Sequence, residues 1–186
     1  EEEDIVLRPI SITRPKEYPG TIVIDRGFSE TFLNRLLNYY KTLPSCPPGK
    51  VSCTTRRYLY DFDESICNTI QNVFSRASGD SSSFAFRKFR VLSYEHVDGF
   101  VPPHVDLSRT YYEIFERKII EHQRSNTGTN RDEVRSTHTL ILYLTDCEKG
   151  GETRLIHRLP RPDDSEDQQE RDLKSSHDVK PRRGRL

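Results

Sequence analysis

Apolar residues recur at helical spacing in two stretches of the first half of the chain. The first stretch follows Ser29, a suitable N-cap, and ends before Pro44, with apolar positions at Phe32, Leu33, Leu36, Leu37 and Tyr40. The second follows Asp63, a further candidate cap, with apolar positions at Ile66, Ile70, Val73 and Phe74. These patterns predict two helices that support a core, and the polar residues 75–82 after the second helix predict a flexible connection.

Alternating apolar and polar residues predict strands at 21–25, 57–60, 84–95 and 136–146. Within 84–95, one face carries Phe89, Val91 and Ser93, and the other carries Arg90, Leu92 and Tyr94. Within 136–146, the leucine face is Leu140, Leu142 and Leu144, and the opposite face is Thr139, Ile141, Tyr143 and Thr145. We expect the leucine face in the core and the face rich in hydroxyl groups along a partly polar cavity.

The remaining segments set the domain organisation. Residues 1–19, acidic and then Pro-containing, are expected to form a loose arm, and residues 20–186 a single domain. Two stretches look like insertions, at about 107–137 and 160–178. The first is either a lid over a site or a surface excursion. The second is acidic, and we expect it to be disordered.

Composition narrows the function classes. Apolar residues make up 33% of the chain and charged residues 31%, so the core must be small. The net charge is +0 and the pI about 7.2, which gives no general argument for nucleic acid, and the basic residues 180–185 are expected to be solvated. No apolar run suits a membrane span, and the acidic start is unlike a signal peptide, so we expect a cytoplasmic or nuclear protein. The four Cys lack metal-ligand spacing and are expected as unpaired thiols.

Residues 89–106 carry the strongest candidate chemistry. A strand is followed by a turn at Gly99 and then by His104 and Asp106, which share a face if strand geometry continues. A neutral imidazole and a carboxylate are two of the three protein ligands of a facial iron(II) site, and the third must come from elsewhere. A second such pair, His96 and Asp98, precedes the turn, so the spacing alone is weak support.

Residues further along the chain strengthen this interpretation. The strand at 136–146 leads into the turn Gly150-Gly151-Glu152 and then Thr153. Taken in order with Tyr94, His104-Val105-Asp106 and residues 142–145, this sequence resembles the prolyl 4-hydroxylase branch of the iron(II)- and 2-oxoglutarate-dependent dioxygenases. The resemblance covers roughly residues 20–186. Its most specific part is the leucine-rich strand with the Gly-Gly-Glu-Thr turn.

The resemblance implies an α+β fold, a double-stranded β-helix (jelly-roll) core with supporting N-terminal helices. It implies that His104 and Asp106 bind iron(II), and that Tyr94, Tyr143 and Thr153 line the pocket of 2-oxoglutarate. Hydroxyl groups make sense there because buried carboxylates need hydrogen-bond donors. In this family 2-oxoglutarate and O2 are converted to succinate and CO2 while an unactivated C–H bond is hydroxylated, often with ascorbate as a supporting cofactor. The implied partner is a peptide or protein substrate, modified at a prolyl or other residue.

One part of the family pattern has no match in this sequence. The family's distal His, and its basic residue for the far carboxylate of 2-oxoglutarate, come after a strand that residues 179–186 would enter. Both positions lie past Leu186, so we expect the chain as given to be inactive even where its parent protein is an enzyme. His157 and His177 are internal substitutes for the distal His, but neither occupies the family position.

Two further functions are compatible with the sequence. The chain is alternatively a catalytically inactive binding module of the dioxygenase fold, which uses its two insertions to hold a partner. A nucleic-acid demethylase of the same fold is a third interpretation, which the near-zero net charge and the Gly-Gly-Glu-Thr turn disfavour.

Overall fold

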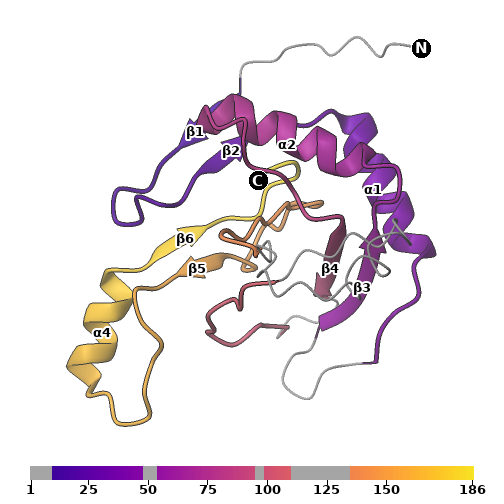
Figure 1. Cartoon of the computed structure of the whole chain (residues 1–186). Helices are drawn as coiled ribbons and strands as arrows, with labels where there is room; N and C mark the ends of the chain where they lie inside the picture. The colour runs from indigo at the N-terminus through magenta and orange to yellow at the C-terminus, as the bar shows by residue number, and fades with distance from the viewer. Residues whose placement is uncertain (1–9, 48–53, 95–98, 110–134) are drawn as a thin grey trace, which may run out of the picture. The chain divides into compact units, whose positions relative to one another are not determined.

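A computed structural model describes residues 10–47, 54–94, 99–109 and 135–186 (Figure 1). The chain divides into two compact units, Glu1–His104 with Ile141–Leu186, and Val105–Leu140. The second unit overlaps the insertion predicted at 107–137, most of which lies outside the described residues. The helices and strands that the structure describes all belong to the first unit.

The first predicted helix is confirmed as α1, Glu30–Thr42. Its N-cap is Ser29, whose Oγ accepts a hydrogen bond from the backbone N–H of Phe32 at 3.1 Å. Its buried residues are Phe32, Leu33 and Leu36, the positions that the helical spacing places on one face.

The second predicted helix is α2, Ser65–Ser78, and its start and end differ from expectation. Asp63 accepts from the N–H of Ser65, but buried Asp61 accepts from two further N–H groups, those of Ile66 and Cys67, at 3.0 and 2.8 Å. Two carboxylates therefore satisfy the helix start. The helix also continues into the predicted connection and ends at Gly79, whose φ of 80° suits a glycine C-cap.

The strands β3, Thr54–Tyr60, and β4, Lys88–Tyr94, form an antiparallel pair with two different faces. Leu59 and Phe89 are directly opposite each other and pack against buried residues of α1 and α2. The other face carries Thr54 opposite Tyr94 and Arg56 opposite Leu92. This confirms the two predicted faces of the 84–95 strand, and the structure adds that the face with Phe89 packs on the core.

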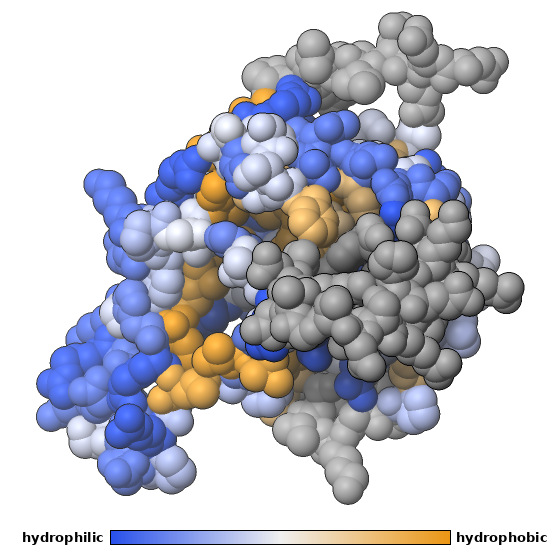
Figure 2. All heavy atoms as spheres, in the orientation of Figure 1, coloured by the Kyte–Doolittle hydropathy of each residue, from blue (hydrophilic) through white to orange (hydrophobic). Residues whose placement is uncertain are grey.

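Two further antiparallel pairs correct the expectations for the arm and the acidic insertion. Strand β1, Ser11–Thr13, pairs with β2, Val23–Asp25, so part of the arm belongs to a sheet. Strand β5, Thr153–Leu155, pairs with β6, His177–Val179, and helix α4, Glu166–Lys174, lies between them in the chain. The 160–178 segment is therefore helical in part. The side chains of α4 itself are mostly hydrophilic, and none of its residues is buried (Figure 2).

The segment predicted as the strand 136–146 is not assigned as a strand in the structure. Its backbone bonds instead to the end of the chain: Tyr143 donates to the carbonyl of Arg185 at 2.9 Å and accepts from Gly184 at 2.8 Å. Leu186 in turn exchanges two backbone hydrogen bonds with Ile24 of β2. On the leucine face Leu142 and Leu144 pack on the core, as expected, whereas Leu140 is exposed.

The described architecture is mixed α and β, with three small antiparallel sheets of two strands each and none of them closed. The double-stranded β-helix stays a prediction. Among the described residues, no helix has the length and apolar character needed to cross a membrane.

Candidate functional site

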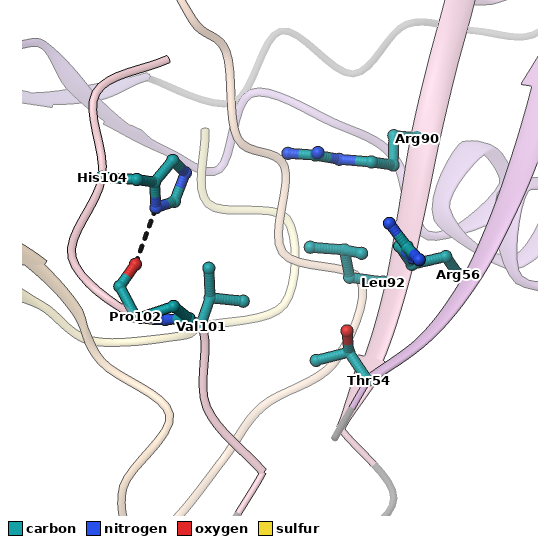
Figure 3. A pocket seen from close by; sticks show the side chains of 7 residues that line it. All are labelled: Thr54, Arg56, Arg90, Leu92, Val101, Pro102 and His104. Atoms are coloured by element: carbon teal, nitrogen blue, oxygen red, sulfur yellow. Dashed lines mark hydrogen bonds between the residues drawn. The ribbon is translucent and has the colours of Figure 1, made fainter. Parts of the chain in front are cut away.

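The second face of the β3–β4 pair lines a pocket of about 240 Å³ (Figure 3). Its lining residues come from both strands and from the segment that leads to His104: Thr54, Arg56, Arg90, Leu92, Val101, Pro102 and His104. Figure 3 shows the side chains of Arg90 and Leu92 extending from β4 toward the side of the pocket where His104 and Val101 lie. The pocket thus combines two guanidinium groups and an imidazole with apolar walls.

His104, the first predicted metal ligand, lies in this pocket. Its Nδ1 donates a hydrogen bond to the backbone carbonyl of Pro102 at 2.8 Å, so the neutral imidazole carries its lone pair on Nε2. Metal-bound His residues are commonly oriented in this way, by a carbonyl that accepts from the nitrogen remote from the metal. The local chemistry of His104 therefore suits a ligand that binds metal through Nε2.

Asp106, the second predicted ligand, belongs to the other unit, Val105–Leu140. Its Oδ2 accepts a hydrogen bond from the hydroxyl of Thr139 at 2.8 Å, the kind of support that ligating carboxylates receive. Residues 99–109 are assigned no strand, so the shared face of His104 and Asp106 stays a prediction. The other His-x-Asp pair, at 96 and 98, lies outside the described residues.

The residues that the structure describes contain no group of three His, Cys, Asp or Glu side chains placed to hold a metal ion. The two internal candidates for a third ligand have other contacts. The ring of His157 stacks on Tyr18, with centroids 4.5 Å apart and planes within 8° of parallel. The ring of His177 is tilted against the same tyrosine, with centroids 6.5 Å apart. Only His104 and Asp106 therefore remain as candidate iron ligands, each with a hydrogen bond of the kind that orients metal ligands. The third protein ligand stays unassigned.

Two of the three residues predicted around 2-oxoglutarate are in direct contact. The hydroxyl of Tyr143 donates to Oγ1 of Thr153 at 2.6 Å, and both side chains are half-buried. The turn between them contains Gly150 and Gly151 with φ of 78° and 76°, a conformation that favours glycine at both positions. The turn before Thr153 thus has the backbone conformation for which a glycine pair is suited; that it sets the Thr153 strand in place stays a prediction.

The third of these residues, Tyr94, ends β4 on the same sheet face as Arg90 and Leu92. Burial raises the pKa of its hydroxyl; Arg90 acts in the opposite direction, and the nearby Tyr143 adds to the increase. The hydroxyl of Tyr94 therefore lies within electrostatic range of the hydroxyl of Tyr143, although half of the surface of Tyr94 is exposed.

Sequence patterns had not assigned a role to Arg56 and Arg90 at the pocket. The alternation of β4 places Arg90 on the face of Tyr94, which was a usable signal. No sequence signal indicated Arg56, because the pairing register of β3 with β4 cannot be deduced from the pattern of either strand alone.

No family model matches this chain, and the comparisons with curated proteins and with solved structures likewise found no match.

Proposed function

We propose that the protein containing this chain is an iron(II)- and 2-oxoglutarate-dependent dioxygenase that hydroxylates a C–H bond, in a prolyl or other peptidyl residue. The observation that carries the proposal is the hydrogen bond between the Tyr143 hydroxyl and Thr153. These two positions are ten residues apart in the chain, and the family resemblance assigns both to the cosubstrate pocket. The contribution of Tyr143 to the raised pKa of Tyr94 supports the same grouping.

The proposal gives these residues a binding role. On binding, the hydroxyl of Tyr143 would turn from Thr153 to donate to a carboxylate of 2-oxoglutarate, which loses its hydration shell on entering the fold. The hydroxyls of Thr153 and Tyr94 would donate to the same ligand. His104, through Nε2, and Asp106 would hold the metal together with a third ligand. Iron(II), when bound, supplies the activation of O2. The carbonyl of Pro102 and the hydroxyl of Thr139 would orient the two ligands.

Replacement of Tyr143 by Phe tests the proposed cosubstrate site. The variant removes one hydroxyl and keeps the ring, so we expect the half-saturating 2-oxoglutarate concentration of the full-length protein to rise about tenfold, the effect of losing one hydrogen bond to a charged group. Tyr58→Phe, an exposed tyrosine on β3, is the matched control and should leave that concentration unchanged. The proposed role of Tyr143 fails if both variants behave like the parent. Binding of 2-oxoglutarate without succinate formation by the parent would favour the inactive module.

A further inference from the structure

From the arginine-lined pocket on the β3–β4 face we infer a binding site for a carboxylate, carried by a small organic acid or by an acidic side chain. Arg56 and Arg90 lie on neighbouring strands of one face, because Arg56 is opposite Leu92 and Arg90 is two residues before it. Diagonal neighbours of this kind have Cα atoms about 7–8 Å apart, within reach of two long side chains that meet one ligand.

Among the described residues, no carboxylate balances the charges of the two guanidinium groups. Within the described part of the chain, neither Arg56 nor Arg90 forms an ion pair with a carboxylate, and the buried Nε of Arg56 has no hydrogen-bond partner. Other arginines of the first unit do have such partners; Arg154, for example, contacts Asp178 with two nitrogens. Two like charges on one sheet face without a counter-ion repel each other, and a bound anion would relieve that repulsion.

The remaining walls favour an organic acid over an inorganic anion. Leu92, Val101 and Pro102 offer apolar surface beside the guanidinium groups, which a ligand with carbon atoms next to its carboxylate can cover. Arginine presents parallel N–H donors that match the two oxygens of a carboxylate. The volume of about 240 Å³ lies below the roughly 300–1,000 Å³ of sites for drug-sized ligands, which indicates a small acid or a single side chain.

This inference goes beyond the proposed dioxygenase activity and is tested without iron. The full chain is titrated by calorimetry at low salt with glutarate and, separately, with the blocked peptide acetyl-Ala-Glu-Ala-amide. Glutaramide and the corresponding Gln peptide are the neutral controls, and inorganic phosphate is the inorganic anion. We expect at least one carboxylate probe to bind about tenfold or more tightly than its amide, as expected for hydrogen bonds to a charged group. The tighter of the two probes identifies the source of the carboxylate.

Variants then locate the binding. Arg90→Gln should weaken binding of the preferred probe about tenfold or more, whereas Lys88→Gln, which removes a cation from the same strand outside the pocket, should not. Arg90 is exposed, so the thermal midpoint of Arg90→Gln should match that of the parent. Arg56→Lys, which keeps the charge but loses the paired donors, is a second variant expected to weaken binding.

Three results would overturn the assignment. The first is that amides or phosphate bind as tightly as the carboxylates, or that no probe binds. The second is that Lys88→Gln weakens binding as much as Arg90→Gln. The third is that Arg90→Gln and Arg56→Lys, both folded, bind like the parent. None of these bears on the Tyr143 test, because that test measures 2-oxoglutarate use in the presence of iron.

Discussion

Asp25 and Arg185, which are 160 residues apart, form a two-point ion pair. Nε and Nη2 of Arg185 each donate to one carboxylate oxygen of Asp25 at 2.8 Å, and both side chains are largely buried. The hydrogen bond from Arg185 holds the pKa of the Asp25 carboxyl below its usual value. The expectation that the basic residues 180–185 are solvated is therefore wrong for Arg185. Composition could not indicate this ion pair, because its acidic partner lies near the other end of the chain.

Replacement of Asp25 by Asn should destabilise the protein at neutral pH by about 1–3 kcal/mol, the range for hydrogen bonds to charged groups. The folded state binds the Asp25 proton less readily than the unfolded state does. Its contribution is therefore complete above about pH 4 and is lost as the pH falls through the lowered pKa. Urea unfolding of parent and variant should thus differ at pH 7 and converge in acid. A pH-independent difference would show that the carboxylate charge is not the source.

At the scale of elements, Gly27 permits close packing between the segment after β2 and helix α2. A Cβ added at Gly27 would lie 2.5 Å from Cγ1 of Val73, which is buried on α2. Gly27→Ala should therefore lower the free energy of unfolding by about 1–3 kcal/mol through overpacking. Val73→Ala in the same chain should recover part of the loss, as contacting sites are not additive. Gly20→Ala, which meets no atom within 4 Å, is the control, and equal effects at Gly20 and Gly27 would contradict this account.

The elements differ in how far the sequence predicts them. Helix α1 followed directly from its periodicity and from Ser29. Helix α4 did not, because its charged composition outweighed local signals that are present: Ser165 accepts from Gln168, and acidic residues begin the helix while basic residues end it. Alternation around Tyr143 indicated which side chains share a face, but it could not indicate that the backbone partner is the 184–186 segment.

For the whole molecule, the predicted site residues divide into two groups. Tyr143 and Thr153 share a hydrogen bond, and Tyr143 contributes to the raised pKa of Tyr94. That all three line a pocket for 2-oxoglutarate stays a prediction. His104 and Asp106 each have suitable supporting contacts, but they belong to different units. The arginine-lined pocket depends on strand register, a tertiary feature that one-strand patterns do not contain.

The most direct test of the central claim is 2-oxoglutarate-dependent succinate formation by the full-length protein supplied with iron(II), measured for the parent, His104→Ala and His157→Ala. Loss of the Nε2 ligand should abolish succinate formation and iron retention in His104→Ala. His157 stacks on Tyr18 and does not line the pocket, so His157→Ala should remain active. Succinate formation by His104→Ala at the parental rate would contradict the account.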